Sequence, residues 1–157
     1  YRQCIFFCKI IKNTEILQKN PEKIVFSMDK KERGFFMEEQ ELLRKLGIWP
    51  NLSGYQYLMK GFEMIRMDPD YLQYVTKRLY PDIADVYQMS WPSVERAIRT
   101  SLITCWDRGN RDFLNEMAGY PLRERPTVSE FFSIAWVYLC REEQKERNRK
   151  TGNSKDG

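Results

Sequence analysis

Hydrogen-bonding side chains recur on one face of a predicted helix near the middle of the chain: Ser93, Glu95, Arg96, Arg99, Thr100 and Thr104. The guanidinium of Arg96 can donate two parallel hydrogen bonds to O6 and N7 of a guanine, and the carboxylate of Glu95 can accept one from N4 of a cytosine. Arg99 lies four residues after Glu95, where it can either pair with that carboxylate or bind a phosphate. These residue types are suited to reading base edges. The alternative is the solvated face of an amphipathic helix, which such patterns usually mark.

Two short helices joined by a tight turn, within residues 79–110, are predicted to position these side chains. Pro81 suits the first turn of a helix, because a proline there loses no helical hydrogen bond. Ser90 is expected to cap a second helix that begins at Trp91, with its hydroxyl accepting a bond from a free backbone N–H, and Pro92 is tolerated in the first turn. Residues expected to be buried are Ile83, Ala84, Tyr87, Val94, Ala97, Ile98, Ser101, Leu102 and Cys105. This is the outline of a helix-turn-helix DNA reader.

The rest of the chain before residue 80 also carries helix signals, which favour an all-α fold. A short helix is predicted over residues 38–46, ending at Gly47, and Ser53 is predicted to cap the next helix. Asp68 and Pro69 close that helix and begin a third. The apolar side chains expected to face inward are Tyr57, Leu58, Gly61, Phe62, Ile65, Leu72, Val75 and Leu79.

Two further helices are predicted after residue 109. Asn110 can cap one that runs through Met117 and ends at Gly119, and Thr127 with Glu130 three residues later has the spacing of a capping box. The last helix contains FFSIAWVYL, which is apolar nearly all round. Such a segment either lies in the core or forms part of a partner surface.

Charge is distributed unevenly along the 157 residues. The whole chain carries a net charge of +4, but residues 37–140 hold 12 basic and 14 acidic side chains. Non-specific attraction to phosphates should therefore be modest, and DNA affinity would require a local basic face. Its candidates, each of which could equally be an ordinary surface charge, are Lys60, Lys77, Arg78, Arg96, Arg99, Arg108 and Arg111.

The chain resembles the C-terminal effector domain of the sporulation initiation response regulator of endospore-forming Firmicutes. The resemblance covers residues 39–139 and is carried by GYQYLMKGFEMI, LYPDIADVY, VERAIR, CWDRGN and PTVSEF, in this order and spacing. It implies a compact bundle of about six helices that contains a helix-turn-helix. It also implies binding to double-stranded DNA at boxes with a TGTCGAA-like core, and an action on transcription.

By this resemblance, Glu95 and Arg96 are base-reading residues. Ser93 stands where the family usually carries another base-reading arginine, so one bidentate guanine contact is lost, at a cost of about 1 to 3 kcal/mol in discrimination. The DNA box is thus expected to differ from that of the family or to be more loosely specified. Thr100 stands where a histidine is common. Residues expected to contact the DNA backbone or support the reading face are Arg99, Thr100, Ser90, Lys77, Arg78 and Arg108.

The resemblance also shapes the expected organisation and partners. Residues 1–37 are interpreted as an N-terminal extension, 38–140 as the DNA-binding domain, and 141–157 as a charged tail that is partly disordered. Expected partners are a second copy, through segment 131–139, and the RNA polymerase sigma subunit. Fewer than 40 residues precede the domain where the regulator has a receiver domain, so a stand-alone regulator is expected. The alternatives are a protein-interaction module that keeps the fold, and a fragment of a longer regulator.

Other functional classes find little support in the sequence. The chain has no histidine, no glycine-rich phosphate loop and no nucleophile elbow, so neither catalytic residues nor a cofactor are predicted. The four cysteines lack the spacing and the histidine partners of a common zinc site and are interpreted as free thiols in a reducing cytoplasm. The apolar run near the N-terminus is too short to span a membrane and is followed by no small-residue cleavage site.

Overall fold

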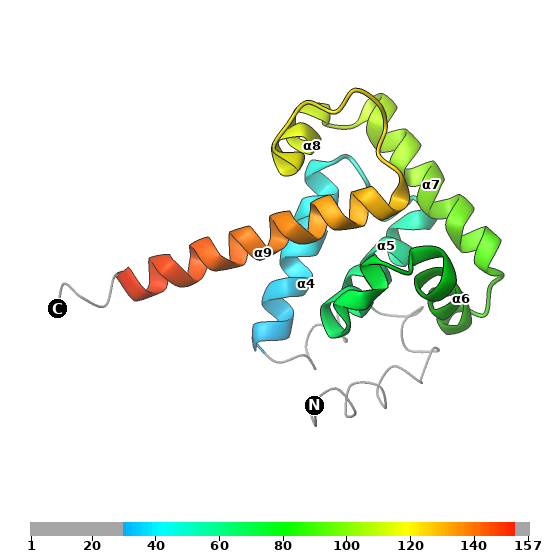
Figure 1. The fold of residues 1–157 in the computed structure, drawn as a ribbon, viewed down its shortest axis with the longest axis horizontal. Helices are drawn as coiled ribbons and strands as arrows, with labels where there is room; N and C mark the ends of the chain where they lie inside the picture. The colour runs from blue at the N-terminus through cyan, green and yellow to red at the C-terminus, as the bar shows by residue number, and fades with distance from the viewer. Residues whose placement is uncertain (1–29, 153–157) are drawn as a thin grey trace.

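The computed structural model describes residues 30–152, and within this range every regular element is helical. The α-helices are α4 (Lys30–Lys45), α5 (Ser53–Met67), α6 (Tyr80–Tyr87), α7 (Trp91–Arg108), α8 (Arg111–Ala118) and α9 (Val128–Gly152). A 3₁₀-helix, η1 (Pro69–Leu72), and a π-helix, η2 (Val75–Leu79), connect α5 to α6. The predicted all-α bundle is confirmed (Figure 1).

Helix α5 is the central element of the bundle and packs against α4, α6 and α7. All members of its predicted apolar stripe are buried. Phe62 contacts Phe132 of α9 edge to face, with ring centroids 5.3 Å apart. Gly61 lies so close to the same ring that a Cβ there would come within 2.6 Å of it. The absence of a side chain at residue 61 therefore lets α5 and α9 cross at short range.

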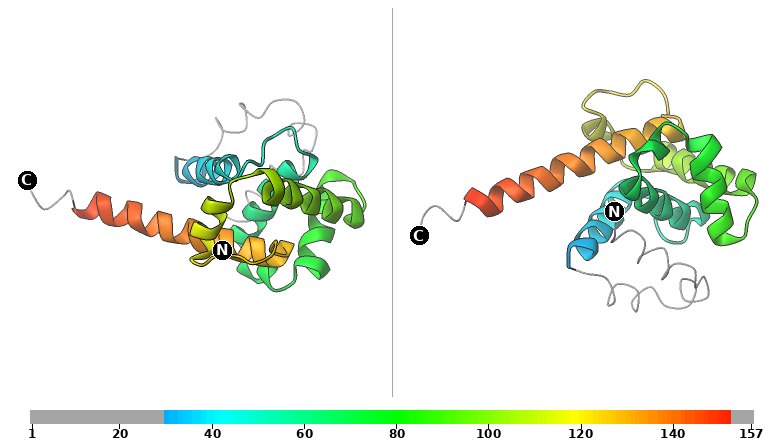
Figure 2. Two further views of the ribbon diagram at one scale, coloured as in Figure 1. Left: turned by 90° about the horizontal axis from the view of Figure 1, so that it is seen from above. Right: turned by 60° about the horizontal axis from the view of Figure 1, so that its bottom comes forward.

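Helix α9 begins in the core and then leaves it. Phe131, Phe132 and Ala135 are fully buried, and Leu139 is nearly so, whereas Val137 on the outer face is 54% exposed. The C-terminal half of the helix projects away from the other helices in all three views (Figures 1 and 2). Segment 131–139 thus contributes to the core through one side, with only its outer side left open.

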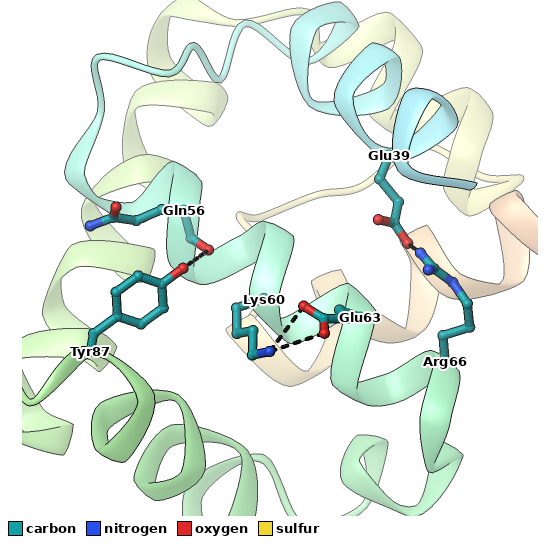
Figure 3. A network of polar contacts seen from close by, with 6 residues as sticks. All are labelled: Glu39, Gln56, Lys60, Glu63, Arg66 and Tyr87. Atoms are coloured by element: carbon teal, nitrogen blue, oxygen red, sulfur yellow. Dashed lines mark hydrogen bonds and ion pairs between the residues drawn. The ribbon is translucent and has the colours of Figure 1, made fainter. Parts of the chain in front are cut away.

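Two polar contacts join α5 to its neighbours, and a third lies within α5 itself (Figure 3). Arg66 of α5 forms an ion pair with the buried Glu39 of α4. The hydroxyl of Tyr87 in α6 donates to a backbone carbonyl of α5, that of Gln56, over 3.3 Å. Lys60 donates to both carboxylate oxygens of Glu63, each at 3.0 Å.

Lys60 was predicted as a candidate for a basic surface face, and this prediction is wrong. The residue is only 6% exposed. Its neighbours on α5, Met59 and Gly61, are also buried, so the aliphatic part of the lysine side chain packs inside the bundle. The ammonium group binds the carboxylate of Glu63 on the same helix.

Two predicted helix starts differ from the structure. The first helix was expected over residues 38–46, but α4 begins at Lys30. The prediction relied on the spacing of apolar residues, and the first residues of α4 are polar, so they gave no such signal although they are helical. Ser53 was expected to cap α5, but it is the first helical residue. The capping position belongs to Leu52, because the Leu52 carbonyl already accepts the N–H of Tyr55 over 3.0 Å.

The stretch 68–79, predicted as a third α-helix, instead forms η1 and η2. The carbonyl of Tyr74 accepts the N–H groups of both Arg78, at 2.8 Å, and Leu79, at 3.2 Å. Pro81 explains this widened turn. A proline has no N–H to donate to the carbonyl four residues before it, and its ring would clash with that carbonyl in a regular α-helix. The π-helix provides that room and runs directly into α6.

The predicted ends of the later helices are confirmed. The Asn110 side chain accepts the N–H of Phe113 over 3.0 Å at the start of α8, and Gly119 ends that helix with a left-handed φ of 81°. Thr127 and Glu130 exchange the two bonds of a capping box at the start of α9. None of the helices in residues 30–152 is both long and apolar enough to cross a membrane.

Candidate nucleic-acid interface

Helices α6 and α7 are joined by residues 88–90 alone, as in a helix-turn-helix. Gln88 adopts a left-handed conformation, with φ of 52°, and the N–H of Met89 returns to the carbonyl of Ala84 over 2.9 Å. These features reverse the chain within one turn. The predicted inner face of the pair is largely confirmed, because the buried residues are Ile83, Ala84, Val94, Ile98, Ser101, Leu102 and Cys105, with Tyr87 and Ala97 half-buried.

Helix α7 is seated on the N-terminal turn of α5 at Gly54. A Cβ at that glycine would lie 2.4 Å from the carbonyl oxygen of Ala97 and 2.4 Å from the hydroxyl oxygen of Ser101. The two helices can approach this closely only because residue 54 has no side chain. Gly54 therefore determines how deeply α7 sits in the bundle and how far its outer face protrudes.

Arg96 occupies the middle of the outer face of α7. With about 3.6 residues per turn, it lies opposite the buried Val94, Ile98 and Leu102. Its side chain is exposed. No group in residues 30–152 forms a hydrogen bond or ion pair with its guanidinium, so the five N–H donors face solvent.

Glu95, the residue before Arg96, is paired with Arg99. Its Oε1 lies 3.3 Å from Nη1 of Arg99, which confirms the predicted i,i+4 pair. The charge of Glu95 also acts on Tyr80, the first residue of α6. Burial raises the pKa of the Tyr80 hydroxyl to about 12, and the negative charge of Glu95 adds to this shift. The carboxylate is therefore oriented before any ligand arrives.

The hydroxyl groups of this face are engaged in local bonds. Ser90 occupies the capping position of α7 with the expected extended backbone, but its predicted bond to a backbone N–H is absent. The Ser90 hydroxyl instead lies 2.8 Å from the hydroxyl of Ser93. Thr100 donates to the carbonyl of Arg96 over 2.8 Å, which leaves only its acceptor lone pairs for a ligand.

A shallow hollow of about 440 Å³ lies between α5 and the outer face of α7. It is lined by Ser53, Tyr57, Met89, Pro92, Ser93, Arg96, Ala97 and Thr100. The three exposed residues predicted from the sequence, Ser93, Arg96 and Thr100, thus border one concave surface.

The remaining basic candidates lie apart from this surface or are already paired. Arg78 binds Asp68 over 3.0 Å, and its guanidinium lies 4.4 Å from the ring centre of Tyr71. Lys77 is exposed on η2. Arg108 is in the last turn of α7, about 18 Å along the helix axis from Arg96. The structure therefore brings together Ser90, Ser93, Glu95, Arg96, Arg99 and Thr100, whereas Lys77 and Arg78 lie on η2 and Arg108 lies at the far end of α7.

Two exposed apolar residues of this region were missed by the sequence analysis. Met89 and Trp91 are each 49% exposed and flank the capping residue of α7. A signal was present for Met89, which precedes the first residue of α7, whereas Trp91 lies three residues before Val94 and has the spacing of the buried stripe. A large apolar side chain in the turn before α7, next to the polar outer face of that helix, could have been singled out as a candidate for contact with a ligand.

Within the described residues, no three carboxylate or cysteine side chains gather closely enough to hold a metal ion. Burial raises the pKa of the Cys105 thiol to about 11, which makes it a poor metal ligand and nucleophile. The predictions for Cys4 and Cys8, and for the N-terminal extension up to residue 29, lie outside the described residues.

Comparison with known protein families agrees with this geometry. Residues 40–139 match the family described as Sporulation initiation factor Spo0A C terminal. The matched region extends from α4 to α9 and includes all of α6 and α7. It covers more than half of the 157-residue chain. The chain therefore belongs to the family of C-terminal, DNA-binding effector domains of the sporulation initiation factor Spo0A.

Proposed function

We propose that this protein is a sequence-specific DNA-binding regulator of transcription in which the first two turns of α7 enter the major groove. Arg96 would bind a guanine through O6 and N7, and Glu95 would accept a bond from the amino group of a cytosine. Ser93 supplies a shorter, uncharged contact beside them. Ser90, Arg99 and Thr100 support this face, and Lys77, Arg78 and Arg108 are candidates for phosphate contacts.

The observation that carries the proposal is the state of Arg96. Its guanidinium stands at the centre of the outer face with no partner in residues 30–152, whereas Arg66, Arg78 and Arg99 in the same bundle are each paired with a carboxylate. The free guanidinium of Arg96 beside the paired carboxylate of Glu95 is an arrangement that can bind a guanine and a neighbouring cytosine. An ordinary solvated face would require neither feature.

Fluorescence anisotropy with labelled duplexes tests this function. We expect a box with a TGTCGAA-like core, or a site selected from random DNA, to bind at least tenfold more tightly than a scrambled duplex at each salt concentration. Arg96→Ala should reduce this preference by about one to two orders of magnitude, because one bidentate pair contributes about 1 to 3 kcal/mol. Arg44→Ala removes an exposed arginine from α4 and should leave the preference unchanged.

Equal binding of box and scrambled duplexes by the native chain, with no site recovered by selection, would contradict the proposal. An unchanged preference in Arg96→Ala would remove Arg96 from the reading face. The protein-interaction module would then be the better description.

The proposal includes two protein partners implied by the family, a second copy of the domain and the RNA polymerase sigma subunit. Since Phe131, Phe132 and Ala135 are buried in the core, a homodimer contact through segment 131–139 would have to use its outer side. Val137 is the most exposed apolar residue of that side. The dimer contact would therefore be small unless the projecting half of α9 also takes part.

A further inference from the structure

We propose that Met89 and Trp91 form an apolar reading element that contacts the C5-methyl groups of thymines next to the base pair bound by Arg96. This inference rests on the proposed function and adds a second kind of base contact to it. Thymine is the base that carries a methyl group in the major groove, and apolar side chains are the groups that recognise it.

The position of the apolar reading element supports this role. Met89 and Trp91 stand immediately before and within the first turn of α7, the part of a recognition helix that reaches base edges. Met89 lines the hollow that also contains Pro92 and Arg96. Trp91 precedes Glu95 by four residues and therefore lies on the same side of α7 as that carboxylate. Met89 thus lies beside Arg96, and Trp91 lies toward the Glu95 side of the helix.

Exposure of these side chains is not explained by the fold. Each is 49% exposed, although the buried stripe of α7 begins only three residues after Trp91. Scattered exposed apolar residues are ordinary in proteins, but here two large ones stand within three positions at the start of the helix that carries Arg96. Covering that surface with thymine methyl groups would remove it from water.

Charge around the element favours DNA over an apolar partner protein. Arg96 and Arg99 are both exposed on the adjoining surface, and the Arg96 guanidinium has no partner within the described residues. A protein partner that covered Met89 and Trp91 would also have to supply acceptors for this arginine. In the major groove, guanine supplies them one or two base pairs away from the thymine methyl.

Replacement of thymine by deoxyuridine tests the inference, because deoxyuridine lacks only the methyl group and keeps every hydrogen-bonding atom. The thymines of the box, or of a site selected from random DNA, are replaced one at a time on both strands. Binding of the whole chain is measured by anisotropy. We expect one or two positions at which the native chain binds about fourfold more weakly per lost methyl contact.

The same titrations on Met89→Ala, Trp91→Ala and the double variant assign the contact. In the double variant the thymine and deoxyuridine duplexes should bind alike. Trp49→Ala, which truncates an aromatic side chain of similar exposure elsewhere, should retain the deoxyuridine penalty. Circular dichroism checks that the variants remain folded, as expected for substitutions at exposed positions.

Each outcome separates this inference from the proposed function. If the native chain prefers its site but binds thymine and deoxyuridine duplexes equally, the apolar reading element is overturned while base reading by Arg96 stands. If the penalty persists in the double variant, the methyl contact belongs to other residues and the assignment is overturned. If no duplex is preferred at all, both the inference and the proposed function are wrong.

Discussion

At the scale of single residues, Lys60 shows how the bundle tolerates a buried charge. Its side chain is 6% exposed, and Nζ lies 3.0 Å from both carboxylate oxygens of Glu63 (Figure 3). Removing the carboxylate would leave a buried ammonium without a counter-charge, which is far more costly than replacing both groups with apolar ones. The pair is thus expected to be strongly coupled even if its net contribution to stability is small.

We predict that Glu63→Ala lowers the free energy of unfolding by about 2 to 4 kcal/mol. Lys60→Met keeps the apolar stem and removes the charge, so it should change stability by less than about 1 kcal/mol. In the Lys60→Met background, Glu63→Ala should then cost little. Urea denaturation followed by circular dichroism measures all four proteins, and an equal cost of Glu63→Ala in both backgrounds would rule out the coupling.

The sequence predicted which residues lie on the outer face of α7 better than it predicted the position of Lys60. Helical periodicity places Arg96 opposite Val94 and Ile98 without any knowledge of the rest of the fold. The burial of Lys60 depends on which neighbours cover that side of α5, and periodicity contains no such information. The roles of Glu95 and Arg96 in base reading are still predictions, because they concern a ligand.

At the scale of elements, the contact of α5 with α7 depends on Gly54. A Cβ there would lie 2.4 Å from the Ala97 carbonyl oxygen, which is backbone and cannot move aside by a rotamer change. We predict that Gly54→Ala lowers the free energy of unfolding by about 2 kcal/mol or more, because α7 must shift. Gly34→Ala is the matched control: nothing lies within 4 Å of its Cβ position in α4, so stability should rise by up to about 1 kcal/mol.

Thermal unfolding of both variants checks this prediction, and DNA binding gives a second readout. If α7 is displaced, Gly54→Ala should also weaken binding to the preferred site at a temperature where the variant is still folded. A variant with native stability would show that α5 and α7 can separate without cost. If Gly54→Ala lowers the free energy of unfolding while Gly34→Ala raises it, the loss in Gly54→Ala comes from the contact between α5 and α7 and not from helix propensity.

Local signals in the sequence predicted most element boundaries but not all. The caps at Asn110 and at Thr127 with Glu130 involve residues three apart, so their bonds could be predicted from spacing alone. The π-helix η2 could not, because it results from the need to accommodate Pro81 within a continuous helical path from Tyr74. Ser90 occupies the predicted capping position, but its hydroxyl does not make the predicted bond to a backbone N–H. It is hydrogen-bonded to the hydroxyl of Ser93 instead.

At the scale of the whole molecule, charge limits how DNA can be bound. Residues 37–140 hold 12 basic and 14 acidic side chains, so the domain has no general attraction for phosphates. Several of its arginines are also neutralised by carboxylates, as Arg44, Arg66, Arg78 and Arg99 are. Under the proposed function, we therefore expect affinity to come from a few phosphate contacts together with base reading by α7 and its apolar reading element.

We therefore predict a weak dependence of DNA affinity on salt. With about two or three phosphates neutralised per domain, the slope of log K against log salt concentration should be about −2 to −3, against about −5 or steeper for proteins with six or more contacts. Lys77→Ala should reduce the magnitude of the slope by about one if Lys77 meets a phosphate beside α6. Lys145→Ala should leave the slope unchanged. Lys145 lies on the projecting half of α9, where it pairs with Glu142 over 2.7 Å. A steep slope that neither substitution alters would mean that basic side chains outside the α6–α7 surface dominate binding, and that base reading contributes less of the affinity than we infer.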